Sequence, residues 1–460
     1  MGMHRVDQTT EQMIRSVLAY AENRLRMDPV PLDEGTLSAD ELYHRLENLI
    51  RDEPRHPDEV LGVYSSVIAP SVISADSPRF LGFIPAAPTK ASLLFDMLVS
   101  CASIQGVSWL EASGAIAAEN TVLRLLADEA GLPPQSGGCF VSGGSAGNLS
   151  ALAVARETAK ERLGDAARGR RLRMIVSGDA HSSIVNTLKL LELNALVVET
   201  PDHRLTGATL QAALERESDL TDVAGVVCTA GTTNAGIVDD LAGVGAIARE
   251  RDWWFHVDGA YGGAGLFARS LRHKFDGIEL ADSFIVDPHK WLFTPFDCCA
   301  LLYRDPELAR RTHTQDASYL DVIHTADGEE DRGEWNPTDY AYHLTRRARG
   351  LPLWFSLAVN GIDAYRSSIE VAAHLARETA SIIRETAHLE LIREPDLGVV
   401  LFRRLGWEAK DYDAWARDLH HEEIAFIPPT KWEGETVGRF AFLHPDTTLD
   451  IVREVLARTV

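Results

Sequence analysis

Short apolar runs alternate with longer amphipathic segments between Gly137 and Tyr303, and this pattern limits the possible folds more than any other feature. Strands that alternate with helices build a mostly parallel sheet with helices on both faces, and such sheets bind ligands at the carboxyl ends of their strands. We predict strands at Cys139–Val141, Leu172–Val176, Leu196–Glu199, Gly225–Thr229, Trp253–Val257, Phe284–Val286 and Ala300–Tyr303, with intervening helices such as Asn148–Arg162, Leu210–Glu217 and Val244–Arg251.

Composition and charge exclude several classes of protein. The chain has 460 residues, 45% of them apolar, and a formal net charge of −23, so it can bury a large core. Nucleic acid and anionic membranes require a basic surface, and neither is an expected partner. No segment is apolar over a length that crosses a bilayer, and Met1–Thr10 lacks the apolar core of a signal peptide.

The cysteines indicate a reducing compartment. There are five of them, an odd number, and they are scattered along the chain without the spacing of a zinc site. We therefore expect a cytoplasmic protein with neither a disulfide framework nor a bound metal.

Two regions flank the alternating segment. Residues 1–80 show helical spacing of apolar residues in Gln12–Arg26 and Ser38–Arg51, but these helices are too few to enclose a core and should pack on another surface, such as a dimer partner. Residues 81–345 form the predicted large domain and residues 346–460 a smaller α+β domain. In the latter we predict helices at Leu353–Arg366, Asp411–His421 and Leu449–Thr459, and strands at Gly398–Arg403 and Gly438–Leu443.

A lysine stands at the end of a predicted buried strand. The segment Asp287-Pro288-His289-Lys290-Trp291 follows the apolar run Ser283–Val286. Lysine normally points into water, and a desolvated lysine has a lowered pKa that leaves the neutral amine needed to form an imine. The alternative is a lysine that only caps the strand at the surface.

An aspartate ends another predicted strand, in His256-Val257-Asp258-Gly259-Ala260. Such a carboxylate can pair with a protonated pyridine nitrogen and keep the ring cationic, and the small residues after it would let a flat ring approach. Taken alone, the pattern favours the alternative, an aspartate that caps the next helix.

Three further turns follow predicted strands. The glycine-rich turn Ser142–Asn148 allows a tight bend and offers helix N–H groups to a phosphate, although it is not a Walker motif. His181 follows the second strand and could stack on a ring, and Thr232 and Thr233 follow the fourth. Each of these signals is ordinary by itself.

The combination resembles the fold-type-I pyridoxal-5′-phosphate (PLP) decarboxylases, the group that contains aromatic amino acid, glutamate and histidine decarboxylases. The segments Pro288–Trp291 and His256–Ala260 carry the resemblance, which extends from about Ser77 to the C-terminus. It implies an α/β fold with a large, mostly parallel PLP-binding domain, a helical N-terminal segment and a small α+β C-terminal domain.

The resemblance also implies roles for single residues. Lys290 would carry PLP as a Schiff base, Asp258 would pair with the pyridine nitrogen, and His181 would stack on the ring. The implied cofactor-binding residues are Ser145, Ala146, Gly147, His181, Thr233, Asp258, Ala260, Asp287, His289 and Lys290, with Asp239 as an acidic residue beyond the ring.

The implied reaction is decarboxylation of an L-amino acid to an amine and carbon dioxide through a quinonoid carbanion. In the family, a tyrosine on a mobile loop returns a proton to the α-carbon. Here that loop falls within residues 313–344, where Tyr340 and Tyr342 are the candidates. Family members without the tyrosine can follow an oxygen-dependent route to aldehydes.

The resemblance places the substrate pocket at Phe83, Ile84 and Pro85, with Val107 and Trp109 of a partner subunit completing it. Val107 replaces an aromatic residue that is common in aromatic amino acid decarboxylases. Phe83 and Trp109 favour a substrate with an aromatic or apolar side chain.

Three alternatives remain open at this stage. A transaminase would need an arginine to clamp the substrate carboxylate, and the cluster Arg346–Arg349 leaves that reading possible. A non-catalytic protein with the same fold would act as an interaction partner. A nucleotide-binding regulator would use the glycine-rich turn, but the chain lacks a Walker lysine there.

Overall fold

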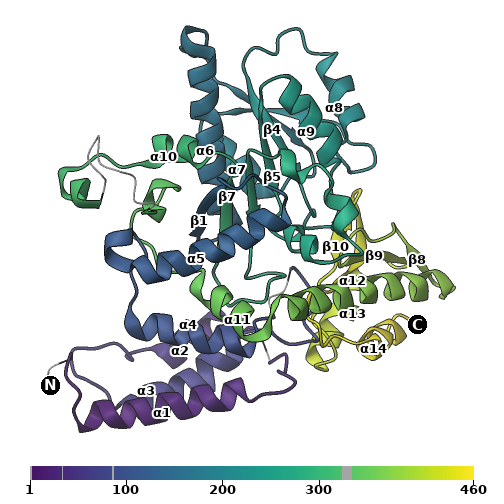
Figure 1. Ribbon diagram of the computed structural model, residues 1–460. Coiled ribbons are helices and arrows are strands. Elements are labelled where there is room, and N and C mark those ends of the chain that lie inside the picture. Colours follow the sequence, from purple (N-terminus) through teal and green to yellow (C-terminus); the bar gives the residue numbers. More distant parts are fainter. Residues whose placement is uncertain (1–2, 34, 85–86, 324–333) are drawn as a thin grey trace.

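The computed structural model describes residues 3–33, 35–84, 87–323 and 334–460, and its centre is a seven-stranded sheet (Figure 1). The order across the sheet is β1-β7-β6-β5-β4-β2-β3, and only β7 runs antiparallel to its neighbours. All seven predicted strands are confirmed. Their bounds are β1 Gly137–Val141, β2 Arg173–Ser177, β3 Asn194–Val198, β4 Val223–Thr229, β5 Trp254–Asp258, β6 Ser283–Val286 and β7 Cys299–Tyr303.

Helices cover both faces of this sheet, because successive side chains of a strand point to opposite sides. In β2, Ile175 belongs to one core cluster, whereas Met174 and Val176 belong to the other. The first cluster includes residues of α5 (Trp109–Glu129), α8 (Gly207–Leu214) and α9 (Leu241–Glu250). The second includes residues of α6 (Gly144–Leu163), α7 (Ser182–Leu190) and α10 (Pro306–His313).

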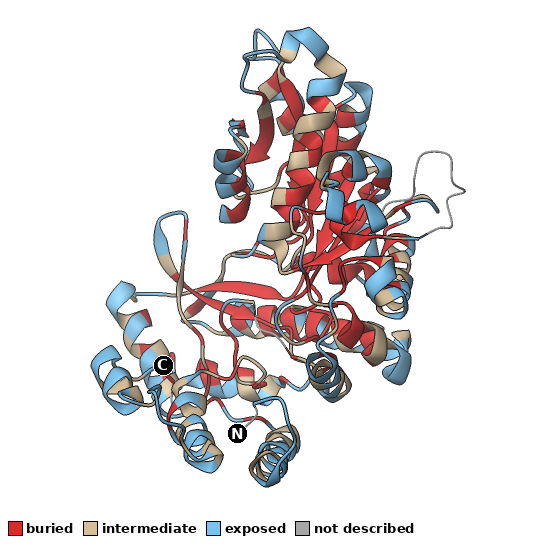
Figure 2. Cartoon of the chain, turned by 90° about the vertical axis from the view of Figure 1, so that its left-hand side faces the viewer, coloured by how far each residue is buried: buried red, intermediate tan, exposed pale blue. Residues whose placement is uncertain are grey.

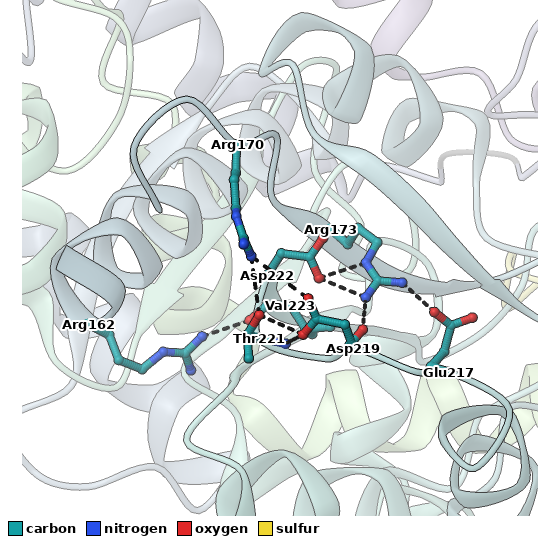
Figure 3. A network of polar contacts seen from close by, with 8 residues as sticks. All are labelled: Arg162, Arg170, Arg173, Glu217, Asp219, Thr221, Asp222 and Val223. Atoms are coloured by element: carbon teal, nitrogen blue, oxygen red, sulfur yellow. Dashed lines mark hydrogen bonds and ion pairs between the residues drawn. The ribbon is translucent and has the colours of Figure 1, made fainter. Parts of the chain in front are cut away.

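Charged side chains hold the amino ends of β2 and β4 together (Figure 3). The Arg173 guanidinium lies 2.7 Å from a carboxylate oxygen of Asp222 and 2.6 Å from one of Glu217. Hydrogen bonding to Asp222 raises the pKa of Arg173 above its usual value. This network lies at the edge of the sheet opposite the carboxyl ends of the strands, so it supports the sheet without occupying the edge where ligands bind.

A smaller antiparallel sheet forms the C-terminal part of the chain. Its order is β10-β11-β9-β8, and it is accompanied by three helices. The bounds are β8 Leu389–Leu391, β9 Val399–Arg404, β10 Thr430–Trp432, β11 Glu435–Ala441, α12 Ile362–Glu385, α13 Ala409–His421 and α14 Leu449–Ala457.

The predicted helix Leu353–Arg366 is wrong in one respect, because Gly361 divides it into α11 (Leu351–Asn360) and α12. Gly361 has φ +78°, a left-handed conformation that glycine adopts without strain. The segment before this break packs on the large domain, since Ala348 and Leu351 share a core cluster with Val99 of α4 (Lys90–Ala102).

The chain at the predicted domain boundary, residues 80 and 81, contacts the C-terminal part of the chain. The Leu81 N–H donates to the Phe426 carbonyl, and the Leu81 carbonyl accepts from the Ala441 N–H. Backbone hydrogen bonds therefore join Leu81 to the C-terminal domain, although Leu81 lies far from that domain in the sequence.

The N-terminal helices α1 (Gln8–Leu25), α2 (Ala39–Leu46) and α3 (Pro57–Val63) lie at one end of the molecule (Figure 1). None of the three buries a residue, and Figure 2 shows them largely exposed while the strands of the sheet are buried. The sequence-based expectation that they do not enclose a core is consistent with this exposure. No described helix is long and apolar enough to cross a membrane.

A fully buried ion pair joins α5 to the chain just before α11. The Arg346 guanidinium lies 2.8 Å from a Glu119 carboxylate oxygen, and their side chains are 0% and 2% exposed. The Glu119 carboxylate also accepts from the Gly350 N–H at 2.8 Å, and Arg346 donates to the Gly106 carbonyl at 2.6 Å. Removal of one partner would leave the other charge buried without compensation.

We predict that Arg346→Met lowers the free energy of unfolding by about 3–5 kcal/mol, because the Glu119 charge then stays buried and unpaired. The matched control is Arg347→Met, which removes a partly exposed pair with Asp96 and should cost less than about 1 kcal/mol. Urea-induced unfolding of both variants measures the difference. Equal midpoints for the two variants would contradict a structural role for the buried pair.

Candidate active site

A cavity of about 390 Å³ opens at the carboxyl edge of the large sheet. The ends of β1, β2, β4, β5 and β6 all contribute to it, because these strands run in the same direction. Nine of the residues that the sequence singled out line this cavity: Ser145, Ala146, His181, Thr233, Asp258, Ala260, Asp287, His289 and Lys290. The sequence-based prediction of a site at this edge thus agrees with the geometry.

Lys290 faces Asp287 across a single turn. Its Nζ lies 3.0 Å from Asp287 Oδ2, and the two side chains are 22% and 2% exposed. Burial lowers the pKa of Lys290, but the attraction of Asp287 outweighs it, with a smaller effect from Asp258, and the pKa is raised overall. The sequence-based expectation of a lysine with a lowered pKa is therefore wrong in sign, because it did not include the carboxylate three residues earlier.

Asp287 has a second oxygen with no partner. Its Oδ1 is buried and accepts no hydrogen bond from any described residue. Gly144 lies directly against the Asp287 carboxylate, since a Cβ at residue 144 would come within 3.1 Å of Asp287 Oδ2 and 3.2 Å of Ala260 Cβ. A side chain at residue 144 would require Asp287 or Ala260 to shift by a few tenths of an ångström, so glycine favours this close approach of α6. No side chain caps this end of the helix. Helix N–H groups left free in this way form an anion site.

Gly147 differs from its neighbours in the glycine-rich turn. It does not line the cavity, and a Cβ there would come within 2.9 Å of Ile285 and 3.1 Å of Cys299. The residue therefore allows α6 to pack closely on β6 and β7. Its expected role as a phosphate contact is not supported by its position.

Asp258 sits at the end of β5 with both oxygens engaged. Oδ1 accepts from the Ala260 N–H at 3.1 Å, and Oδ2 accepts from Asn148 Nδ2 at 2.9 Å. Asn148 also donates to Ser183 Oγ at 3.0 Å. Asn148 and Ser183 both line the cavity, although the sequence indicates no functional role for either.

Two histidines border the cavity. His181 is exposed in the single chain, and its Nδ1 accepts from the Ser183 N–H at 3.2 Å. His289 is buried, and its Nδ1 lies 2.7 Å from the Cys298 carbonyl oxygen and 3.0 Å from the Cys298 nitrogen. Burial lowers the pKa of His289, which favours its neutral form.

Buried charges fix the loops behind the cavity. Asp239 accepts from the N–H groups of Thr229 and Leu205 at 2.7 and 2.8 Å, and burial raises its pKa to about 7. Arg439 of β11 is also buried and donates to the carbonyls of Thr233, Asn234 and Phe83. It thus ties the small domain to the turn after β4, a role for which the sequence gives no local signal.

The candidate tyrosines do not reach the cavity within one chain. Tyr340 is buried in a core cluster, with its ring stacked 4.1 Å from that of Trp335. Tyr342 is half exposed and lines a separate surface groove beside Arg311 and His313. The structure therefore does not support Tyr340 as a proton donor in its own subunit. Residues 324–333 of the expected loop lie outside the described residues.

The expected substrate residues also lie outside the cavity of one chain. Phe83 is 62% exposed and packs against Phe80 and Phe426, whereas Val107 is buried. Neither these residues nor Ile84 and Trp109 line the cavity. Pro85 lies outside the described residues.

The arginine cluster offers no carboxylate clamp at the cavity. Arg346, Arg347 and Arg349 are paired with Glu119, Asp96 and Asp297, respectively. None of the three lines the cavity. These arginines therefore do not support the hypothesis that the protein is a transaminase.

Comparison with known proteins adds to this geometry. The model of the pyridoxal-dependent decarboxylase conserved domain matches residues 40–405. The chain belongs to this family. It is therefore a carboxy-lyase that depends on PLP, and the fold and cofactor expected from the sequence are confirmed.

Curated relatives cover most of the chain. An aromatic-L-amino-acid decarboxylase from Bacillus atrophaeus is 28% identical over 448 residues, which are 95% of this chain and 91% of the relative. The decarboxylase of the same name from Cavia porcellus is 32% identical and covers 77% of each chain.

Solved structures show the same fold. The Oryza sativa TDC crystal structure with PLP and tryptamine has a TM-score of 0.89 and 23% identity, over 100% of this chain and 99% of that one. Mouse CSAD has a TM-score of 0.87 and 23% identity, over 98% and 97% of the two chains.

The residues around the cavity fit this cofactor. The uncapped start of α6 and Gly144 form a cradle for an anion, while Lys290 and Asp258 supply an amine and a carboxylate to the same cavity. In the described ranges, no group of histidine, cysteine and acidic side chains could hold a metal ion.

We predict that Asp287→Asn lowers the pKa of Lys290, because burial persists while the neighbouring negative charge is lost. In the cofactor-free protein, acylation of Lys290 followed by mass spectrometry should then reach its half-maximal rate at a lower pH than in the wild type. Asp297→Asn is the matched control, since Asp297 lies in the same loop but pairs with Arg349. An unchanged midpoint in Asp287→Asn would show that Asp287 does not set the charge of Lys290.

Proposed function

We propose that this protein decarboxylates an L-amino acid with an aromatic or apolar side chain, releasing the amine and carbon dioxide. The observation that carries the proposal is the meeting of Lys290, Asp258 and the uncapped end of α6 in one cavity. Relatives named aromatic-L-amino-acid decarboxylase cover most of the chain and support the substrate class.

Each group at the cavity would then have a defined task. Bound PLP supplies an electron sink that accepts the bonding electrons as carbon dioxide leaves. Lys290 Nζ holds the cofactor covalently until the substrate amine replaces it. The N–H groups at the start of α6 and the hydroxyl of Ser145 bind the phosphate, since an anion is stabilised at a helix N-terminus.

Asp258 and the residues around it set the electrostatics. The buried Asp258 carboxylate would pair with a protonated pyridine nitrogen of bound PLP and so favour the release of carbon dioxide from the substrate. His181 at the mouth of the cavity would cover the ring and exclude water from that side. Thr233 and Ala260 line the remaining wall.

A homodimer is part of this proposal. The apolar residues Met13, Ile14, Val17 and Leu18 of α1 are all exposed in the single chain, and a second copy of the chain would cover them. Phe83, Val107 and Trp109 do not reach the cavity of their own chain. A dimer that brings Trp109 and the chain around Val107 to the partner's cavity would complete the substrate pocket.

A second candidate function is the oxygen-dependent conversion of an amino acid to an aldehyde. The observation in its favour is that neither Tyr340 nor Tyr342 lines the cavity. The described tyrosine that does line it, Tyr261, is buried, and its hydroxyl accepts from the Gly398 N–H at 2.8 Å. A Rhodiola rosea 4-hydroxyphenylacetaldehyde synthase shares the fold, with a TM-score of 0.86 and 22% identity.

Product analysis of the PLP-loaded protein separates these reactions. We predict that, across a panel of aromatic, acidic and basic L-amino acids, the aromatic ones yield carbon dioxide and an equal amount of amine. Asp258→Asn should retain the fold and lose about 10²-fold or more in kcat, because the charge that stabilises the cationic ring is gone. If an aldehyde forms and oxygen is consumed, the second candidate function is correct and decarboxylation to an amine is not. If a keto acid forms without carbon dioxide, both candidate functions are contradicted.

We predict that Leu18→Glu shifts the protein towards monomers in sedimentation experiments and reduces activity in parallel, because a charge is placed in the proposed dimer contact. Leu405→Glu is the matched control, since Leu405 is equally exposed (48% against 52%) but lies in the small domain. A fully active monomer, whether wild type or variant, would contradict the proposed shared site.

A further inference from the structure

We propose that Asn148 is a positioning residue that fixes the Asp258 carboxylate and the His181 ring relative to each other, with Ser183 as the link. This inference rests on the proposed function, in which Asp258 and His181 contact the cofactor. The observation behind it is a continuous chain of buried hydrogen bonds from the centre of the sheet to the cavity.

Asn148 stands where this chain branches. Its Nδ2 donates to Asp258 Oδ2 at 2.9 Å and to Ser183 Oγ at 3.0 Å, and its Oδ1 lies 2.8 Å from His256 Nε2. Asn148 is only 1% exposed. Both amide hydrogens are thus used, and water cannot replace either contact.

The orientation of the Asn148 amide is determined by its neighbours. If the amide were flipped, its oxygen would face the Asp258 carboxylate at 2.9 Å, and two acceptors would repel each other. With the amide as it stands, Oδ1 must accept from His256. His256 therefore carries its proton on Nε2.

The other side of His256 agrees with this assignment. Its Nδ1 lies 2.7 Å from Ser283 Oγ, and Ser283 Oγ accepts from Trp254 Nε1 at 2.8 Å. The Ser283 hydroxyl is then free to donate to Nδ1. Burial lowers the pKa of His256 to about 4, so the ring is neutral at physiological pH and keeps this single tautomer.

The chain continues towards the cavity through Ser183. Ser183 Oγ accepts from Asn148, so its own hydrogen can be donated to His181 Nδ1, which lies 2.8 Å away. The Ser183 N–H donates to the same Nδ1 at 3.2 Å. A His181 ring that accepts at Nδ1 carries its hydrogen on Nε2. The backbone N–H holds this nitrogen in any case, and the direction of the Asn148 amide decides whether the Ser183 hydroxyl also donates to it.

Through Ser183, a change at Asn148 should affect His181. Asn148 forms no hydrogen bond with His181, yet Asn148→Asp should alter His181. The new carboxylate oxygen would accept from the Ser183 hydroxyl, and that hydroxyl would no longer donate to His181. The substitution Asn148→Asp would also place a second negative charge beside the Asp258 carboxylate.

The first readout uses the cofactor-free protein and needs no activity. In ¹⁵N NMR spectra of histidine-labelled protein, with His181 assigned through His181→Gln, we expect the Nδ1 signal of His181 to move in Asn148→Asp and in Ser183→Ala. It should stay in place in Ser183→Thr, which keeps the hydroxyl, and in Ser182→Ala, the exposed neighbour. In the double variant, Asn148→Asp should add nothing to Ser183→Ala, because the link is already absent.

The second readout uses the PLP-loaded enzyme with an accepted amino acid. Asn148→Asp loses a hydrogen bond to the Asp258 carboxylate and should lower kcat by about 10- to 100-fold, with KM little changed. Ser183→Ala loses hydrogen bonds between neutral groups only and should lower kcat by about 3- to 10-fold. Ser183→Thr should restore kcat to within about threefold of the wild type, since its hydroxyl can replace that of serine.

The outcomes separate this inference from the proposed function. A His181 signal that does not respond to Asn148→Asp, or responds equally in the Ser183→Ala background, would overturn the link through Ser183. If Asn148→Asp does not fold, the contrast between Ser183→Ala and Ser183→Thr decides the same question. Absence of decarboxylation in the wild type would overturn the proposed function, while the spectra of the cofactor-free protein would still test the positioning role.

Discussion

The parallel pairing of β4, β5 and β6 is the constraint on which the site depends. It places Asp258 and the Asp287–Lys290 turn at the same edge of the sheet, although they are far apart in the sequence. The close packing of α6 on this sheet then brings the glycine-rich turn to the same point, because Gly144 and Gly147 have no side chain to hold the helix away. These contacts position Asp258, the Asp287–Lys290 turn and the glycine-rich turn, whereas His181 and Ser183 come from the start of α7, after β2.

Charge is the second organising factor, since Asp258, Asp287 and Lys290 all lie at the cavity. Two carboxylates and one ammonium group leave an excess of negative charge in a largely buried region. The chain stabilises it with donors: Asn148 and the Ala260 N–H for Asp258, and Lys290 for Asp287. Such an arrangement suits a cofactor with a cationic ring at one end, while its phosphate is bound separately by helix N–H groups.

Much of the fold and part of the site could be predicted from the sequence. The strands have strong local signals, and the residues that follow them must meet at one edge, which is why Lys290, Asp258 and His181 could be recognised. The roles of Asn148 and Ser183 could not, because an amide in the first turns of a helix and a serine after a histidine have no distinctive spacing. The raised pKa of Lys290 depends on where the Asp287 side chain points. The packing role of Gly147 could not be predicted, because a glycine that permits close packing resembles one that contacts a ligand. Tyr340 was a candidate because of its position in the chain, and packing against Trp335 removes it from the cavity.

The most direct test of this account is to reduce the PLP-loaded protein with borohydride, which makes an imine link permanent, and to map the modified peptide by mass spectrometry. The account predicts that the cofactor is found on Lys290 alone, and that Lys290→Ala retains no label. A label on another lysine, or no covalent label in a protein that binds PLP, would contradict the central claim that Lys290 at the end of β6 carries the cofactor.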